Sequence, residues 1–341
     1  MTDGPPSPGS PLAGLRIALA GPGRVGTSLV HWATARGASL ELVAGRTPER
    51  CAALAGDLGG RTVPLEALVS EGCDLLLVAV ADPALDDVAH DLAPRPQAAV
   101  CLHTAGGRGA AALEPLATAG SAAGAFHPLK AFPEPLTSLD EAAGTFFALD
   151  GPAPALELGR RLADAFGGTA EVVPERLRPL YHLAASVAAG GVTTLVASTA
   201  DLVRELGLPD AVALGYLELA AGALDRVRAA ASTARDRTGT SGESVSDAMA
   251  RAITGPVARG ELDGFARRLE ALRAAGPAGR RRVELFARLA LETARLAPGA
   301  RVRGDGGGGG GDEALEAALR RLGLGRGPDA PGFLDPSGRE C

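Results

Sequence analysis

The chain has 341 residues, which exceeds the usual size of one domain and predicts two. Hydrophobic residues make up 46% of it, enough for real cores, and a net charge of -6 argues against a polyanionic partner such as nucleic acid. The four cysteines, Cys51, Cys73, Cys101 and Cys341, show no CxxC pair and no metal-binding spacing, so we expect a reduced, cytoplasmic protein without a metal site.

The first half of the chain alternates short apolar runs with helical patterns. Residues 1–13 are rich in proline and glycine and lack a basic start, which predicts a disordered lead-in and no signal peptide. From residue 14 to residue 174 the alternation indicates right-handed crossovers and a doubly wound parallel α/β sheet. Strands are predicted at 15–20, 40–45, 62–65, 73–81, 98–104, 123–127 and 145–151, with helices at 26–36 and 48–58.

The second half, residues 175–298, is predicted to be an all-helical domain. Its uncharged run at 183–200 has the length of a membrane span, but its Ala, Gly, Ser and Thr content favours a buried helix of a soluble protein. Residues 299–341 are expected to be a glycine-rich linker and flexible tail with a weak helix at 313–322. The predicted helices of the domain cover 177–206, 209–234, 243–253, 261–275 and 277–297.

A glycine pattern marks the first turn between strand and helix. Gly21, Gly23 and Gly26 form GxGxxG, with Arg24 and Val25 between the last two, directly after a predicted strand and at the start of a helix. In this context the glycines allow a tight turn and close approach of a pyrophosphate to the helix N-terminus, as in Rossmann dinucleotide-binding domains. The alternative is an ordinary glycine-rich turn.

The end of the second strand selects between dinucleotides. A carboxylate at this place would hold the ribose of NAD, whereas this chain has Arg46 and Thr47. A guanidinium and a hydroxyl suit the additional phosphate of NADP, and the cofactor predicted is therefore NADP. Thr47, followed by Pro48, is also expected to cap the next helix.

Further candidates follow later strands. Ala81 and Asp82 follow the fourth strand at the ligand-binding edge, although Asp-Pro is also a typical helix start. His103 and Thr104 end the next strand, beside the expected nicotinamide, and His127 lies at another strand end. These five residues are the further site candidates that we expect at the carboxyl edge of the sheet.

Taken together, several motifs resemble a known family. They are GPGRVG, AVADPAL, HTAGG, FHPLKAF, YHLAAS and ITGPVARGE, within residues 14–297. The chain is similar to Rossmann-like oxidoreductases whose helical C-terminal domain has no known function. These are relatives of 6-phosphogluconate and 3-hydroxyisobutyrate dehydrogenases, pyrroline-5-carboxylate reductase and ketopantoate reductase.

The resemblance implies roles for residues of the helical domain. Thr254 and Arg259, in a glycine-proline break of the helices, would line the interdomain cleft, with Arg259 clamping a carboxylate; a plain helix-to-helix turn is the alternative. Two departures bear on catalysis. Residues 189–191 read Ala-Gly-Gly where the family reads like Ala-Ser-Asn, and Arg267 and Arg268 stand where the family tends to carry a histidine.

The function expected is NADP-dependent reduction of a small carbonyl or imino acid, with a ketopantoate-like substrate implied by the resemblance alone. His182, at the start of the long helix, is the first candidate for the proton donor, and His127 is the second, because imidazole titrates near neutrality. Lys130, the only lysine of the chain, is interpreted as incidental. A non-catalytic NADP-binding sensor or partner-binding module is the alternative, favoured by Gly190. A homodimer through the helix rich in small residues is expected, and no membrane partner.

Overall fold

The computed structural model describes residues 9–68, 72–94, 98–236, 244–259 and 262–297. The chain divides into two compact units, Met1–Val192 and Thr193–Cys341, and each is described by itself. The division falls inside the helical run, so that the first turns of the long helix go with the sheet. Most of the predicted lead-in and the whole predicted tail lie outside the described residues.

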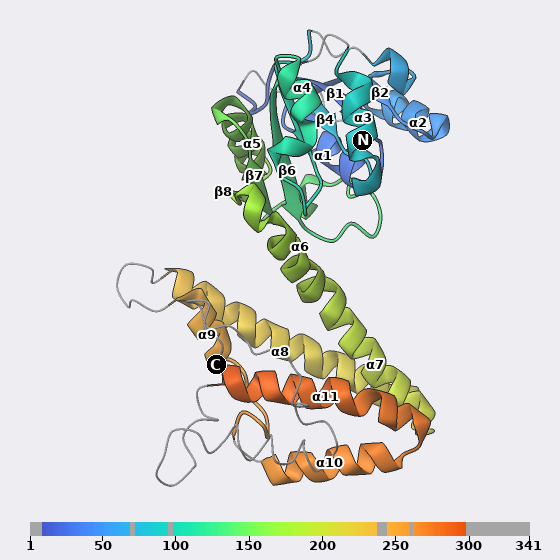
Figure 1. Cartoon of the computed structure of the whole chain (residues 1–341), viewed down its shortest axis with the longest axis vertical. Helices are drawn as coiled ribbons and strands as arrows, with labels where there is room; N and C mark the ends of the chain where they lie inside the picture. The colour runs from blue at the N-terminus through green and yellow to red at the C-terminus, as the bar shows by residue number, and fades with distance from the viewer. Residues whose placement is uncertain (1–8, 69–71, 95–97, 237–243, 260–261, 298–341) are drawn as a thin grey trace. The chain divides into compact units, whose positions relative to one another are not determined.

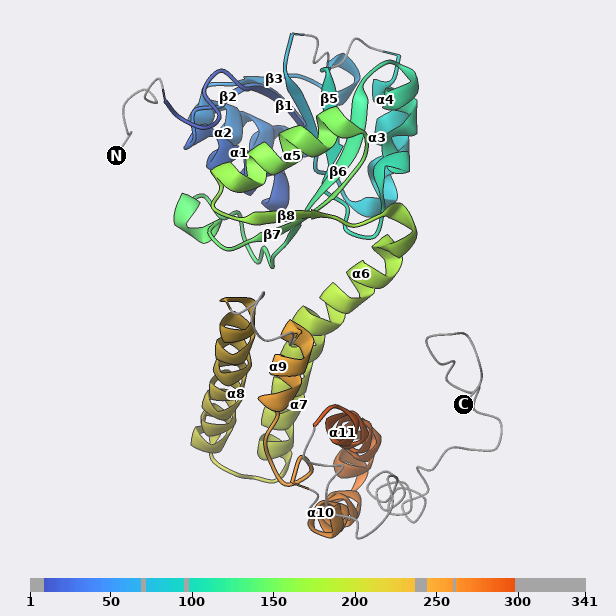
Figure 2. The ribbon, with the colours of Figure 1, turned by 90° about the vertical axis from the view of Figure 1, so that its left-hand side faces the viewer.

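The first unit is built on one eight-stranded sheet of order β3-β2-β1-β4-β5-β6-β7-β8 (Figures 1 and 2). Apolar runs form its central strands, and all four residues of β4 are buried, as expected of a strand covered on both faces. The predicted Rossmann-type sheet is confirmed. The strands are β1 Arg16–Ala20, β2 Ser39–Ala44, β3 Arg61–Thr62, β4 Leu75–Val78, β5 Val100–His103, β6 Ala122–Leu129, β7 Phe146–Asp150 and β8 Thr169–Val172.

The far end of the sheet departs from the predicted all-parallel pattern. Strand β7 pairs antiparallel with β6, with His127 opposite Ala148, whereas the other neighbouring strands run parallel. Strand β8 was not predicted, because its residues are largely exposed and carry little apolar signal.

Helices cover both faces of this sheet. One buried cluster joins α1, α2 and α5 to the sheet and includes Trp32, Phe126 and Phe166; a second joins α3 and α4 to the opposite face. Figure 2 shows α1 and α5 on the near face. The helices are α1 Arg24–Thr34, α2 Pro48–Leu58, α3 Leu85–Leu92, α4 Glu114–Thr118 and α5 Ala153–Ala165.

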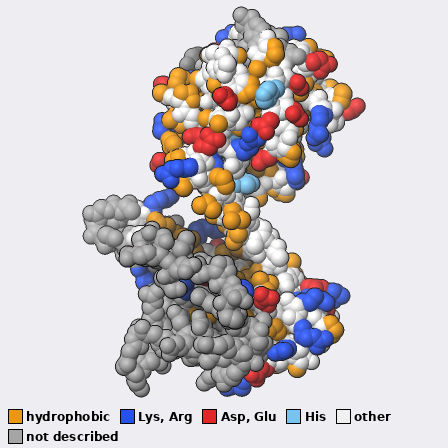
Figure 3. Space-filling model, viewed as in Figure 1, with side chains coloured by type: hydrophobic (Ala, Val, Ile, Leu, Met, Phe, Trp, Pro, Cys, Tyr) orange, Lys and Arg blue, Asp and Glu red, His pale blue; other side chains and the backbone are white. Residues whose placement is uncertain are grey.

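A helical run follows the sheet, comprising α6 (Arg178–Ser186), the π-helical turn η6 (Val187–Gly191) and α7 (Val192–Glu205). The span Glu175–Glu205 is long and apolar enough to cross a membrane, with mean hydropathy 1.5, but one such helix is weak evidence for a span. The predicted burial of this helix is wrong: Leu183 and Val187 are 59% and 61% exposed, and Figure 3 shows hydrophobic side chains gathered over α6. The absence of charged residues from this run shows only that the helix is apolar; it does not show that another part of the protein packs against it.

The second unit is helical in its described part, as predicted. Its helices α8 (Asp210–Asp236) and α9 (Val245–Arg251) pack together, and α10 (Leu262–Ala274) packs on α11 (Pro277–Leu296) around Leu269. The predicted interruption at Gly255 and Pro256 is present, since α9 ends at Arg251.

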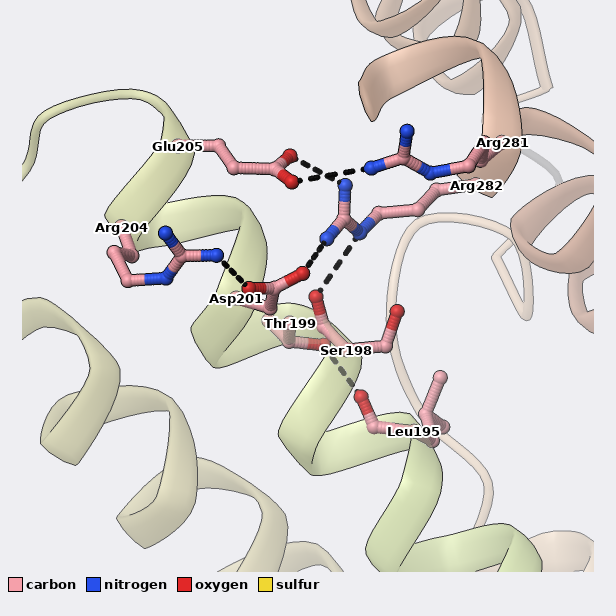
Figure 4. Close-up of polar contacts among 8 residues, drawn as sticks. All are labelled: Leu195, Ser198, Thr199, Asp201, Arg204, Glu205, Arg281 and Arg282. Atoms are coloured by element: carbon pink, nitrogen blue, oxygen red, sulfur yellow. Dashed lines mark hydrogen bonds and ion pairs between the residues drawn. The ribbon is translucent and has the colours of Figure 1, made fainter. Parts of the chain in front are cut away.

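An arginine network joins α7 to the start of α11 (Figure 4). The buried Arg282 guanidinium donates to the Ser198 carbonyl at 3.2 Å and to Glu205 at 2.6 Å, and also pairs with Asp201. Arg204, by contrast, is an exposed partner of Asp201. Because Arg282 is buried and bonded on three sides, it holds α11 against α7.

Candidate functional site

The glycine loop lies at the carboxyl end of β1, where parallel α/β sheets bind ligands. Gly21 has φ +99°, in the region that favours glycine, and its N–H donates to the carbonyl of Ala44 at the end of β2. Gly26 is buried, and a β-carbon there would come within 2.9 Å of the Ala79 β-carbon. Gly23 is the N-cap of α1 and no side chain caps it, so the first N–H groups of the helix are available to an anionic ligand.

Arg24 and Val25 occupy the first turn of α1. The Arg24 guanidinium donates to the Pro133 carbonyl at 3.0 Å, and the Leu136 N–H donates to Ser28 Oγ at 2.7 Å, so the segment after β6 lies along α1. Val25 packs against the core. Lys130 belongs to the same segment and is exposed.

The two residues predicted to select NADP are exposed at the end of β2. Thr47 is the N-cap of α2, as predicted, but its side chain makes no capping hydrogen bond. Its hydroxyl and the Arg46 side chain are therefore open to a phosphate at the start of a helix.

Ala81 and Asp82 follow β4 at the same edge and are both exposed. Ala81, not Asp82, is the N-cap of the short 3-10 helix η2 (Asp82–Ala84). Asp82 thus opens the turn without being its cap.

His103 ends β5 and is fully buried. Its Nδ1 accepts from the Ala105 N–H at 3.1 Å, and its Nε2–H donates to the Gly109 carbonyl at 2.8 Å. Burial lowers the pKa of His103 to about 4, so the ring is neutral near pH 7. Because both ring nitrogens are hydrogen-bonded to the backbone, His103 holds the loop 104–109 in place. Thr104, the first residue of that loop, donates its N–H to the Val78 carbonyl.

The two candidate proton donors lie together, and a third group joins them. His127 Nδ1 and the Tyr181 hydroxyl are 2.9 Å apart, and the rings of His127 and His182 meet edge to face at a centroid distance of 5.6 Å. His182 Nδ1 is buried, and within the described part of the chain it has no hydrogen-bond partner. His127 lies inside β6, two residues before its end, while Tyr181 and His182 belong to α6.

The His127–Tyr181 pair is uncharged near pH 7. Burial, followed by the neighbouring His182 and Arg178, lowers the pKa of His127 to about 3. Burial raises the pKa of the Tyr181 phenol, and Arg178 opposes this rise. Tyr181 therefore carries a proton, and His127 is a neutral imidazole that can accept one at Nδ1 while giving one at Nε2.

Gly106 brings the loop after β5 against both histidines. A β-carbon at Gly106 would lie 2.7 Å from His127 Nε2 and 2.8 Å from His182 Cε1, closer than ordinary contact. Sequence reasoning missed Gly106, Tyr181 and the buried Arg178, although HTAGG and YHLAAS had been singled out as motifs. The proximity of Tyr181 to His182 in the chain was the one available signal.

Thr254 and Arg259 belong to the second unit, in the segment between α9 and α10, and both are exposed. The Arg259 N–H donates to the carbonyls of Gly255 and Pro256. Their predicted place in an interdomain cleft stays a prediction.

The departure from the family pattern at residues 189–191 falls on the π-helical turn η6. Turns of this kind are rare and frequently lie at functional sites. The helix is thus irregular where the family's carboxamide would stand.

Two family models match the chain. Residues 16–104 match NADP oxidoreductase, coenzyme F420-dependent, and residues 145–293 match a domain of unknown function, DUF2520. The chain joins an NADP oxidoreductase domain to a DUF2520 domain. The resemblance predicted from the motifs is thereby confirmed, and the family description names NADP, the predicted cofactor, beside coenzyme F420.

Solved structures share the fold of this NADP oxidoreductase and DUF2520 chain at low identity. Protein TM1727 from Thermotoga maritima is 21% identical with TM-score 0.59, over 82% of this chain and 99% of its own. The candidate NADP oxidoreductase BF3122 from Bacteroides fragilis is 21% identical with TM-score 0.60, over 83% and 100%. An imine reductase from Myxococcus stipitatus, solved with NADP+, is 16% identical with TM-score 0.57, over 90% and 99%. No curated protein sequence matches the chain.

Proposed function

We propose that this protein is an NADP(H)-dependent oxidoreductase that reduces the C=O or C=N bond of a small acid. The observation that carries the proposal is the cluster of His127, Tyr181 and His182 against the loop 104–109. This loop follows β5, at the same edge of the parallel sheet as the glycine loop after β1. A proton-transfer group and a dinucleotide loop on one edge are the two parts that such a reduction needs.

The residues present fit the dinucleotide. Backbone N–H groups at the start of α1 would hold the pyrophosphate, and Arg46 and Thr47 would hold the additional phosphate of NADP. NADPH supplies a hydride when bound; the chain supplies the proton. His127 and His182 are the residues placed to hold that proton, with Thr254 and Arg259 as candidates for orienting the substrate from the second unit.

Cofactor choice is tested by fluorescence titration with NADPH and NADH. We expect tighter binding of NADPH, by about tenfold to a hundredfold from a charge-assisted contact of about 1.5–3 kcal/mol, and a smaller difference in Arg46→Ala. Equal affinities of the parent protein for NADPH and NADH would contradict the NADP assignment.

The chemistry is tested by screening keto and imino acids for NADPH oxidation. We expect His127→Ala or His182→Ala to lose turnover by about 10²- to 10⁴-fold with NADPH binding retained, and Lys130→Arg to stay active. Loss of turnover in Lys130→Arg, with both histidine variants active, would overturn these roles.

A non-catalytic NADP-binding sensor is the second candidate, favoured by the missing carboxamide at residues 189–191. Tight NADPH binding without turnover on any member of a broad panel would favour this candidate.

We further propose a cytoplasmic homodimer formed through the helices. The three described cysteines are free and buried, as suits a reducing compartment, and Leu214, Leu217 and Leu219 on α8 are 63%, 47% and 65% exposed. Analytical ultracentrifugation decides the oligomeric state, and a monomer at micromolar concentration contradicts the dimer.

A further inference from the structure

Arg178, the first residue of α6, is a fully buried cation. Its Nε–H donates to the Val173 carbonyl at 3.0 Å, which fixes the guanidinium. Both terminal nitrogens are buried, and among the described residues neither has a hydrogen-bond partner. Since arginine stays protonated in proteins, these unpaired N–H groups carry a desolvation cost that a purely structural side chain has no reason to keep.

The groups around Arg178 place its charge beside the proton-carrying pair. Tyr181 follows three residues later on α6, and therefore lies on the same side of the helix. The Tyr181 hydroxyl is 2.9 Å from His127 Nδ1. The other charged or titratable groups near Arg178, His127 and Tyr181 are His103, Asp150, Glu175 and His182.

The nearby carboxylates do not bond to the guanidinium. Asp150 Oδ2 instead accepts the Ala110 N–H at 2.8 Å. A bidentate carboxylate would cancel much of the positive charge locally, whereas an unpaired guanidinium exerts its field on its neighbours.

We propose that Arg178 is a positioning residue that sets the charge of the His127–Tyr181 pair. The proton that the substrate receives is then passed from Tyr181 through His127. The inference deepens the proposed reductase function and rests on it for its role in turnover. A cation beside an imidazole disfavours a second proton on the ring, which prevents His127 from storing the proton as imidazolium. The same cation stabilises the phenolate that Tyr181 becomes.

The proton reaches the substrate through two transfers along the pair. As the substrate carbon is reduced, the Nε2–H bond of His127 breaks and its proton goes to the substrate oxygen or nitrogen. The O–H bond of Tyr181 breaks and its proton goes to His127 Nδ1, which leaves the electron pair on the phenolate oxygen. Water returns a proton to the phenolate after turnover.

The test is the titration of Tyr181 without cofactor or substrate. The chain has two tyrosines, and the other, Tyr216, lies on α8, so Tyr216→Phe leaves Tyr181 as the one phenol. In that background the ultraviolet absorbance of the phenolate is followed against pH. We expect Arg178→Gln to raise the phenol pKa by about one to three units, and Arg178→Lys to leave it within about half a unit.

Asp150→Asn is the matched control, because it removes a neighbouring charge while an amide oxygen can still accept the Ala110 N–H. Asp150 Oδ2 bonds to the Ala110 N–H and not to Tyr181, so the phenol pKa in this variant should stay much closer to that of the parent than in Arg178→Gln. If Arg178→Gln does not fold, the double variant with Asp150→Asn keeps the buried site neutral and should show the same rise.

An unchanged phenol pKa in Arg178→Gln or in the double variant overturns the proposal, and so does a rise in Arg178→Lys as large as in Arg178→Gln. Failure of the reductase function has a separate signature, which is loss of NADPH binding or absence of turnover in the parent with the titration results intact.

Discussion

Gly106→Ala tests whether the loop after β5 holds the two histidines in place. A β-carbon at Gly106 would lie 2.7 Å from His127 Nε2 and 2.8 Å from His182 Cε1, where ordinary contact begins at 3.4 Å. Each ring must therefore move by more than half an ångström. The backbone at Gly106 does not have positive φ, so alanine causes no strain there and the effect comes from the rings alone.

The expected size of the effect follows from this displacement. Overpacking of a filled site costs about 1–3 kcal/mol, and each kcal/mol lowers the melting temperature by about 2–4 °C in a unit of this size. A misplacement of about 1 Å in a catalytic group can reduce turnover about 10²-fold. We therefore expect a small loss of stability, retained NADPH binding and a large loss of NADPH oxidation.

Gly107→Ala is the matched control for this measurement. A β-carbon at Gly107 would meet the His182 ring at 3.7 Å, an ordinary contact, and this residue too lacks positive φ. Thermal unfolding, fluorescence titration and steady-state NADPH oxidation are compared for both variants. Equal turnover in the two variants would refute the reasoning, since only Gly106 contacts both rings.

Three further outcomes are expected. Gly26→Ala should abolish NADPH binding by fluorescence titration, because a β-carbon there overlaps the glycine-loop backbone; retained affinity contradicts the phosphate-loop assignment. The pKa of buried His103 is lowered from 6.5 to about 4, so the unfolded chain takes up its proton first and stability is lost as pH falls below 6.5. Urea unfolding should show a loss of about 3 kcal/mol from this residue by about pH 4, and His103→Asn should lack that part of the pH dependence. Arg282→Ala should cost the second unit about 1.5–3 kcal/mol, because it removes the charge-assisted hydrogen bonds of a buried guanidinium, whereas the loss in the exposed Arg204→Ala should be clearly smaller; equal losses in chemical denaturation would contradict the role of burial.

Local patterns in the sequence were sufficient for the strands and helices that carry the dinucleotide loop. Continuous apolar runs such as Leu75–Val78 predict strands covered on both faces, and a glycine pattern between strand and helix predicts a phosphate site. The break at Gly255 and Pro256 was likewise readable, because neither residue suits a helix interior. These features depend on residues within about one turn or one strand of each other.

Pairing direction and exposure were decided by the tertiary structure. The antiparallel course of β7 beside β6 depends on how the segment between them returns, and β8 has too little apolar pattern to predict a strand. The exposed run containing Leu183 and Val187 has the composition of a buried helix, yet composition does not tell whether another surface covers it.

The sequence by itself determined the candidates His127 and His182, through residue type and position near predicted element ends. Only the tertiary structure joined His127 to Tyr181, which is 54 residues away, and placed Gly106 against both histidines. It likewise showed that His103 is bonded on both ring nitrogens and that Arg178 is buried without bonds at its terminal nitrogens. Hydrogen bonds and close contacts between distant residues depend on the path of the backbone between them, and the local patterns that predict helices and strands carry no information about that path.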